Sequence, residues 1–189
     1  MFKEIVLIGR SNVGKSTLFT AITGKKVNVG RRPGITRYHF KVQVGSVFYV
    51  DMPGYGFMLR TSKADQDRTK NLILDYFEEH AEDILLAVQV IDAASFLDIA
   101  NRWEGRGEVP LEIELYEFLG DLGLEVVVAA NKMDRISKHD EDQALDAIVE
   151  RLGMLPPWRQ WSDKIAPISA KRGQIEPLQR IINAKLAKG

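Results

Sequence analysis

The sequence contains no cysteine among its 189 residues. A chain without cysteine has no disulfide framework, no thiolate zinc site and no thiol nucleophile, which favours a reducing, intracellular setting. Its three histidines leave little for a histidine-rich metal site. Long hydrophobic runs are also absent near the start, because the first apolar run, residues 5–8, is too short for a signal peptide or a membrane span. We therefore expect a soluble, cytoplasmic protein with no membrane contact.

The rest of the composition is that of an ordinary globular protein, with 45% hydrophobic and 28% charged residues. Length and the absence of a linker predict one domain over residues 1–189. Net charge is zero, but the charges are segregated. Residues 1–44 carry nine basic and one acidic side chain, residues 159–189 carry seven and two, and residues 45–158 carry ten and 23. If the basic ends meet in the fold, they offer a surface to an anionic partner.

Apolar runs bounded by turn residues recur along the chain and are typical of buried strands. They are residues 5–8, 47–50, 84–91, 126–130 and 165–168. Apolar residues at helical spacing lie between several of these runs, as in 111–122 and 145–152. Residues 38–44 alternate between apolar and polar and predict an antiparallel hairpin with 47–50. This order predicts an α/β fold with a mostly parallel sheet of about six strands, one antiparallel hairpin strand and helices on both faces.

Residues 93–109 show no clear period. They mix charged residues, an asparagine, a tryptophan and two glycines. We expect this segment to be the longest irregular connection, a loop that is functional or faces a partner.

Directly after the first predicted strand, residues 9–16 read GRSNVGKS, the pattern of a phosphate-binding loop. Its glycines let backbone amides converge on the α and β phosphates, and the following helix N-terminus adds partial positive charge. Lys15 is then expected to reach the β and γ phosphates, and the Ser16 hydroxyl to ligate Mg²⁺. The alternative, a glycine-rich turn that caps a helix, is disfavoured by the strand-to-helix context.

Residues 131–134 read NKMD and follow the strand predicted at 126–130, at the strand end where ligands bind in open α/β sheets. Asp134 can accept from both N1–H and the 2-amino group of guanine, a pair of donors that adenine lacks. A solvated helix cap is the alternative. After the last predicted strand, the Ala170 amide can face guanine O6 and the Lys171 stem can cover the base. In isolation, residues 169–171 are better interpreted as an ordinary N-cap.

Asp51-Met52-Pro53-Gly54 ends the strand predicted at 47–50. This position places a carboxylate near the metal, through a water, and the Gly54 amide near the γ phosphate, although a plain proline turn has the same sequence. Residues 32–37 read RPGITR and lie before the hairpin, where a loop can bring the Thr36 hydroxyl and carbonyl over Mg²⁺ and the γ phosphate. A loop without function would look similar.

These five motifs occur in the order typical of Ras-like GTPases, and the resemblance covers nearly the whole chain. Within that group the sequence resembles the EngB family, which is related to Era, EngA and TrmE, on GRSNVGKS, RRPGITR, DMPGYG and NKMD. The resemblance implies a Ras-like P-loop fold in a single G domain, binding of GTP and GDP, GTP hydrolysis and Mg²⁺ dependence. It also implies a role in large ribosomal subunit assembly and in normal cell division and septation.

The motifs and the resemblance together give the expected site. The expected nucleotide-binding residues are Gly9, Arg10, Ser11, Asn12, Val13, Gly14, Lys15, Ser16, Thr17, Gly34, Ile35, Thr36, Arg37, Tyr38, Asp51, Met52, Pro53, Gly54, Asn131, Lys132, Met133, Asp134, Ser169, Ala170 and Lys171. The expected catalytic residues are Lys15, Thr36, Gly54 and Asn12. The expected metal ligands are Ser16, Thr36 and, through a water, Asp51.

One residue departs from the Ras pattern. Tyr55 follows Gly54, where a glutamine would orient the attacking water, so we expect slow intrinsic hydrolysis. In related GTPases an asparagine at the position of Asn12 is associated with a K⁺ ion that bridges the phosphates. The resemblance therefore suggests K⁺-dependent hydrolysis, and the alternative is a helix-entry residue that satisfies loop amides.

Three other functions stay open. A regulatory GTPase with a protein partner unrelated to the ribosome is mildly disfavoured by the charge segregation. A P-loop kinase gives no reason for NKMD, and a module that holds GTP without turnover is kept open by Tyr55. The sequence shows no RRM or KH pattern, so a contact with ribosomal RNA would use the GTPase surface itself. We expect a monomer.

Overall fold

The computed structural model describes residues 3–26, 39–55 and 63–187. Within them the strands are β1 Lys3–Gly9, β2 Phe40–Val44, β3 Val47–Asp51, β4 Ile84–Asp92, β5 Val126–Asn131 and β6 Ile165–Pro167. The helices are α1 Lys15–Thr23, α2 Lys63–His80, α3 Phe96–Glu104, α4 Leu111–Asp121, α5 Glu141–Arg151 and α6 Glu176–Leu186. Short 3₁₀ turns cover Met133–Arg135, Trp158–Trp161 and Ala170–Arg172.

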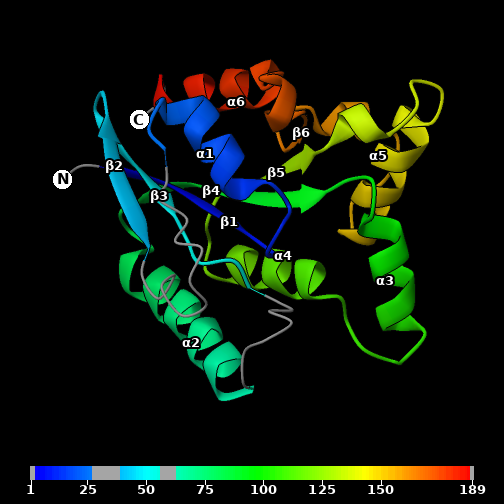
Figure 1. The fold of residues 1–189 in the computed structure, drawn as a ribbon, viewed down its shortest axis with the longest axis horizontal. Helices are drawn as coiled ribbons and strands as arrows, with labels where there is room; N and C mark the ends of the chain where they lie inside the picture. The colour runs from blue at the N-terminus through cyan, green and yellow to red at the C-terminus, as the bar shows by residue number, and fades with distance from the viewer. Residues whose placement is uncertain (1–2, 27–38, 56–62, 188–189) are drawn as a thin grey trace.

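The six strands form one sheet in the order β2-β3-β1-β4-β5-β6 (Figure 1). Every neighbouring pair is parallel except β2 and β3, which form an antiparallel hairpin. The hairpin turns at Gly45, whose φ of 61° suits glycine. This arrangement confirms the expected fold class and the position of each expected strand.

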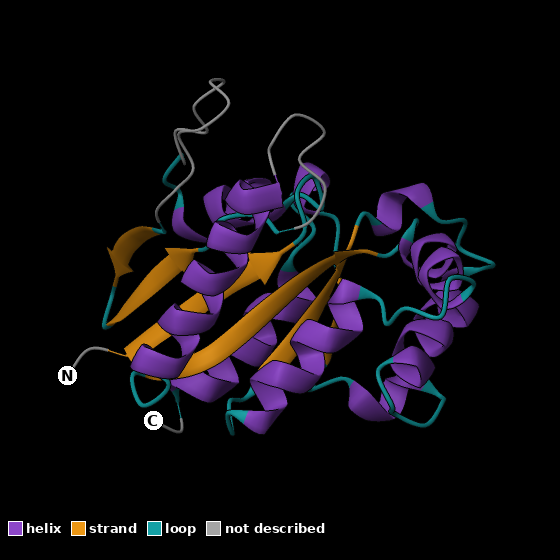
Figure 2. Ribbon diagram, turned by 90° about the horizontal axis from the view of Figure 1, so that it is seen from below, coloured by secondary structure: helices purple, strands orange, loops and turns teal. Residues whose placement is uncertain are grey.

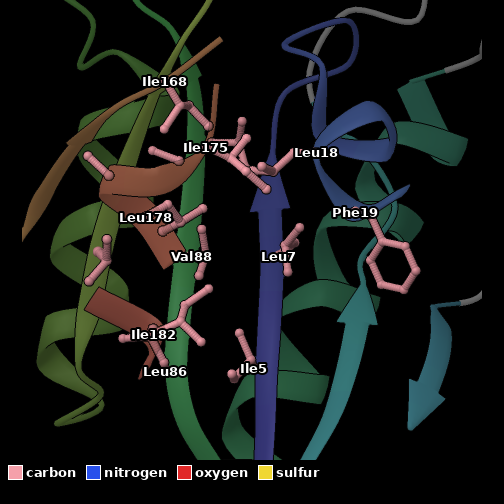
Figure 3. Packing of buried hydrophobic residues seen from close by; sticks show 14 of the residues in the cluster. Ile5, Leu7, Leu18, Phe19, Leu86, Val88, Ile168, Ile175, Leu178 and Ile182 are labelled. Carbon is pink, nitrogen blue, oxygen red and sulfur yellow. The ribbon is translucent and has the colours of Figure 1, made fainter. Parts of the chain in front are cut away.

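Side chains alternate between the two faces of the sheet, as the pleat of a strand requires. Ile5 and Leu7 of β1 point to the face that α1 and α6 cover, and they share one core cluster with Leu178 of α6 (Figure 3). Val6 and Ile8 point to the opposite face and pack with α2 and α4. Figure 2 shows helices on both sides of the sheet, as expected. The α1 helix, near the start of the chain, and the α6 helix, near its end, thus cover the same face of the sheet.

The expectation for residues 93–109 is wrong, because α3 occupies Phe96–Glu104. Phe96 and Ala100 are buried, at a spacing of four residues that places them on one face of a helix. The α3 helix packs against α5, where the Arg151 guanidinium pairs with Glu104. Phe96, Ile99, Ala100 and Trp103 do have the spacing of one helix face, and sequence reasoning missed it because the pattern is short and is followed by charged residues and glycines.

The α2 helix is an element that sequence reasoning did not assign. Ile73, Tyr76 and Phe77 are buried in the core cluster of the second face, again at helical spacing. In the part of the chain that the structure describes, no helix combines the length and the apolar character needed to cross a bilayer.

Candidate functional site

The predicted phosphate-binding loop connects β1 to α1. Gly14, with φ 95°, directly precedes the first residue of α1, and Asn12 has φ 69°. Gly14 must be glycine for a second reason, since a Cβ there would lie 2.4 Å from Nδ2 of Asn131. A Cβ on Gly9 would lie 2.4 Å from the carbonyl oxygen of Val90. Left-handed residues in a turn of this kind let successive backbone N–H groups form an anion-binding concavity.

Lys15, Ser16 and Asp51 meet at the start of α1. The Lys15 ammonium pairs with Oδ1 of Asp51, and the Ser16 hydroxyl donates to Oδ2 of the same carboxylate at 3.3 Å. Lys15 is 8% exposed and Asp51 is 6% exposed. The lysine supplies a positive charge suited to phosphate, and the hydroxyl and carboxylate are oxygen ligands of the kind that Mg²⁺ prefers. These residues therefore fit a magnesium ion.

The segment after β3 lies directly against the phosphate-binding loop. Tyr55 donates its backbone N–H to the Gly9 carbonyl at 3.4 Å, and its own carbonyl accepts from the Ser11 N–H at 3.0 Å. A Cβ on Gly54 would lie 2.9 Å from Oγ and 3.1 Å from Cα of Ser11. Close approach to the loop therefore requires glycine at position 54, and the two motifs lie side by side.

Asn131, the last residue of β5, connects the loop to the segment after β6. Its Nδ2 donates to the Val13 carbonyl at 2.8 Å, and its Oδ1 accepts from the Ala170 N–H at 2.9 Å. The residue is 2% exposed. Three separate motifs are joined through this one buried amide.

Lys132, the next residue, also bonds to the phosphate-binding loop. Its ammonium donates to the Asn12 carbonyl at 2.7 Å and to Oδ2 of Asp92 at 2.6 Å. Sequence reasoning missed Asp92, although it ends β4 and so lies at the edge of the sheet where ligands bind. A pocket of about 320 Å³ lies beside the phosphate-binding loop, and Asn12, Asp92 and Lys132 line it.

Asp134 and Ser169 come together at the same edge of the sheet. The Ser169 hydroxyl donates to Oδ1 of Asp134 at 2.7 Å, and Nε of Arg172 lies 3.7 Å from Oδ2. The Ser169 hydrogen bond, followed by the charges of Arg172 and Lys171, holds the pKa of Asp134 below its ordinary value. The carboxylate is therefore ionised near neutral pH. Ser169 occupies the N-cap position of the Ala170–Arg172 turn but makes no side-chain cap hydrogen bond, because its hydroxyl binds Asp134 instead.

The structure thus brings together the expected residues on the loop at 9–17, on 51–54, on 131–134 and on 169–171. Five expected residues, among them the metal ligand and catalytic candidate Thr36, lie outside the described residues. They are Gly34, Ile35, Thr36, Arg37 and Tyr38.

Comparison with known proteins agrees with this geometry. Residues 4–132 match the family described as 50S ribosome-binding GTPase. The probable GTP-binding protein EngB of Methanopyrus kandleri is 50% identical over 174 residues, which cover 90% of this chain and 85% of that protein. Its counterpart in Archaeoglobus fulgidus is 47% identical over 178 residues, which cover 94% and 89%. A crystal structure of a probable GTP-binding protein engB has a TM-score of 0.89 at 39% identity, covering 98% of this chain and 100% of that chain.

Proposed function

The chain belongs to the EngB family of GTP-binding proteins, and from this we propose a Mg²⁺-dependent GTPase that acts as a nucleotide switch in assembly of the large ribosomal subunit. The observation that carries the proposal is the buried contact of Asn131 with both Val13 and Ala170. This contact joins the phosphate-binding loop to the segments that carry Asp134 and Ser169, and Asp134 is the carboxylate that we propose reads guanine. We further propose that residues 1–189 form a single G domain that works as a cytoplasmic monomer.

In this proposal the base is selected by Asp134. Its ionised carboxylate accepts from guanine N1–H and the 2-amino group, while Ser169 and Arg172 hold it in place. Adenine would leave the carboxylate without donors. Replacing Asp134 with alanine should therefore abolish the preference for a fluorescent GDP analogue over the ADP analogue. Asp140→Ala is the matched control, because Asp140 also accepts from a serine hydroxyl at 2.7 Å but lies on the surface.

The phosphates are bound by the loop amides and by Lys15, which gains a second anionic partner beside Asp51. Ser16 would hold Mg²⁺ directly and Asp51 through a water, with Thr36 as the third expected ligand. When bound, the ion neutralises charge on the β and γ phosphates. The Gly54 amide, next to the loop, is the proposed contact of the γ phosphate.

Intrinsic hydrolysis is proposed to be slow, because Tyr55 stands where a glutamine would orient water. Burial, and then the charge of Glu112, raise the pKa of the Tyr55 phenol far above its ordinary value. The phenol therefore stays protonated and serves poorly as a base. Asn12 is exposed at the loop and is the proposed ligand of K⁺. Single-turnover phosphate release should be faster in KCl than in NaCl, and Asn12→Ala should remove this difference.

A ribosomal partner is supported by the family description and by the distribution of basic residues. Lys25, Lys26 and Arg180 are exposed, and they belong to the segments around α1 and α6 that meet on one face of the sheet. Lysine and arginine give sequence-independent affinity for RNA phosphates. We propose that this surface contacts ribosomal RNA and that loss of the function also disturbs cell division and septation.

The deciding experiment is co-sedimentation of the protein with ribosomal subunits in GDP or in a non-hydrolysable GTP analogue. Binding to large subunits only with the GTP analogue is the expected result. Absence of binding in both states would move the function to a GTPase with a protein partner unrelated to the ribosome. If Asp134→Ala keeps the guanine preference of the wild type and of Asp140→Ala, the proposed role of Asp134 is overturned.

A further inference from the structure

Three buried side-chain oxygen atoms lack a hydrogen-bond partner within the described residues: the Tyr55 hydroxyl, Oε1 of Gln89 and Oε2 of Glu112. These side chains belong to one cluster beside the phosphate-binding loop. Nε2 of Gln89, on β4, donates to the backbone carbonyl of Glu112 at 2.7 Å and so attaches the first turn of α4 to the sheet. Buried polar groups without partners are costly, so their grouping at one place calls for a functional reason.

Arg10 of the phosphate-binding loop completes the cluster. Its Nη1 lies 3.3 Å from Oε1 of Glu112, and the two side chains are 14% and 4% exposed. The guanidinium carbon also lies 6.0 Å from the ring centroid of Trp103 on α3. A buried ion pair is weak support for stability, because desolvation of both charges offsets their attraction. An apolar pair of similar size would stabilise this position at least as well.

Tyr55 connects this cluster to the reacting end of the site. Its backbone bonds to Gly9 and Ser11, on either side of Arg10, while its hydroxyl is buried in the cluster. Burial, and then the charge of Glu112, raise the pKa of the phenol, so the hydroxyl stays protonated near Glu112 without a hydrogen-bond partner among the described residues. The Tyr55 backbone is thus fixed to the loop by two hydrogen bonds, while its side chain reaches into the buried region of Glu112.

We propose that Glu112 is a positioning residue of the GTPase reaction, which holds the Gly54–Tyr55 peptide against the phosphate-binding loop through Arg10 and Tyr55. The inference rests on the proposed function, because Gly54 is the proposed contact of the γ phosphate. Gly54 lies too close to Ser11 for any side chain. Because Gly54 is bonded to Tyr55, a small shift of Tyr55 also moves the Gly54 amide. Loss of the Glu112 charge removes the anion that pairs with Arg10, which lies between the two loop residues that bond to the Tyr55 backbone.

The test compares Glu112→Gln, which keeps the shape of the side chain, with Glu114→Gln. Glu114 lies two residues later on α4, is half-exposed and pairs with Lys70 at 3.2 Å. We expect Glu112→Gln to slow single-turnover hydrolysis of bound GTP about tenfold, since misplacement by 1 Å can cost about a hundredfold. Affinity for GDP, which has no γ phosphate, should stay within about threefold of wild type. Glu114→Gln should match wild type in both measurements.

Tyr55→Phe removes only the hydroxyl and is the second variant of the hydrolysis test. If Glu112 acts through Tyr55, the double variant should be no slower than the slower single variant, whereas independent roles would make the two effects multiply. Should Glu112→Gln fail to fold in thermal melts, Tyr55→Phe alone must show the slow hydrolysis with unchanged GDP affinity. Wild-type rates in these variants overturn the inference and leave the GTPase proposal standing. A wild-type protein that binds GTP without hydrolysing it overturns both.

Discussion

Replacing Asn131 with alanine should destabilise the fold more than its single small side chain suggests. The change leaves the Val13 carbonyl and the Ala170 N–H without their partner in a site that is 2% exposed. Each orphaned buried group costs about 1–3 kcal/mol, so we expect a loss of about 4 kcal/mol. For a chain of this length, about 2–4 °C of melting temperature correspond to each kcal/mol, which gives a decrease of about 8–16 °C.

The measurement is thermal unfolding followed by circular dichroism, without nucleotide and at one protein concentration. Asn101→Ala is the control, because Asn101 is exposed and accepts one hydrogen bond from Arg151 at 2.8 Å. Surface changes of this kind shift stability by about 0.5 kcal/mol at most. A decrease for Asn131→Ala no larger than that of the control would refute the reasoning, because it would mean that water satisfies both groups.

Asn131→Asp sharpens the same test. Aspartate keeps the shape and an oxygen that accepts from the Ala170 N–H, but it replaces the donor to the Val13 carbonyl with a second acceptor. The change also introduces a buried charge, which is more costly to desolvate than a neutral amide. We therefore expect this variant to be no more stable than Asn131→Ala. Full stability in Asn131→Asp would show that shape alone, and not the donor, matters at this position.

Three further predictions concern single residues. In urea unfolding, Gly14→Ala should lose clearly more stability than Gly24→Ala. Both glycines have positive φ, which costs about 1–2 kcal/mol for alanine. Only at Gly14 would the new Cβ also lie 2.4 Å from an Asn131 atom. Phe19→Ala should cost about 3–5 kcal/mol in the same assay, because the ring is fully buried between α1 and the sheet. The pKa of Asp134 is lowered from 3.8. The ionised carboxylate should therefore support guanine binding at every pH above 3.8, and this support should be lost only as the pH falls through the lowered pKa. The ratio of GDP affinities of wild type and Asp134→Asn should therefore be constant between about pH 5 and pH 8.

The sheet could be predicted from the sequence because parallel strands buried on both faces are continuous apolar runs. Residues 5–8 and 126–130 are runs of this kind, and the strands extend them by no more than two residues at either end. The alternation before Gly45 predicted β2 for a different reason, because a strand covered on one face has apolar residues at every second position, and Val42 is the residue of β2 that packs against the core. The α3 helix was missed although Phe96, Ile99, Ala100 and Trp103 have helical spacing, because this short pattern runs directly into the charged and glycine-rich residues 104–108.

The site was predictable where its chemistry is concentrated in short motifs and unpredictable where it depends on single residues far apart in the chain. Asn131 reaches Val13 across 118 positions, but both belong to motifs that mark the same ligand. Glu112 has no such marker, since it is one of 26 acidic residues and pairs with Arg10 across 102 positions. Asp92 likewise can be recognised as a site residue only when the fold brings the end of β4 next to Lys132.

Two sets of residues bond to the phosphate-binding loop, and mutations in the two sets should affect nucleotide binding differently. On one side Asn131 and Lys132 bond to the carbonyls of Val13 and Asn12, next to the residues proposed to bind the base. On the other side Tyr55 bonds to the loop around Arg10. Variants on the first side should weaken GDP and GTP binding to a similar extent, because both nucleotides share the base and the first two phosphates. Variants on the second side should affect only the nucleotide that carries a γ phosphate. The ratio of GDP to GTP-analogue affinity, measured for Lys132→Ala and Tyr55→Phe, therefore distinguishes a loop with two independently supported halves from one that responds as a single rigid unit.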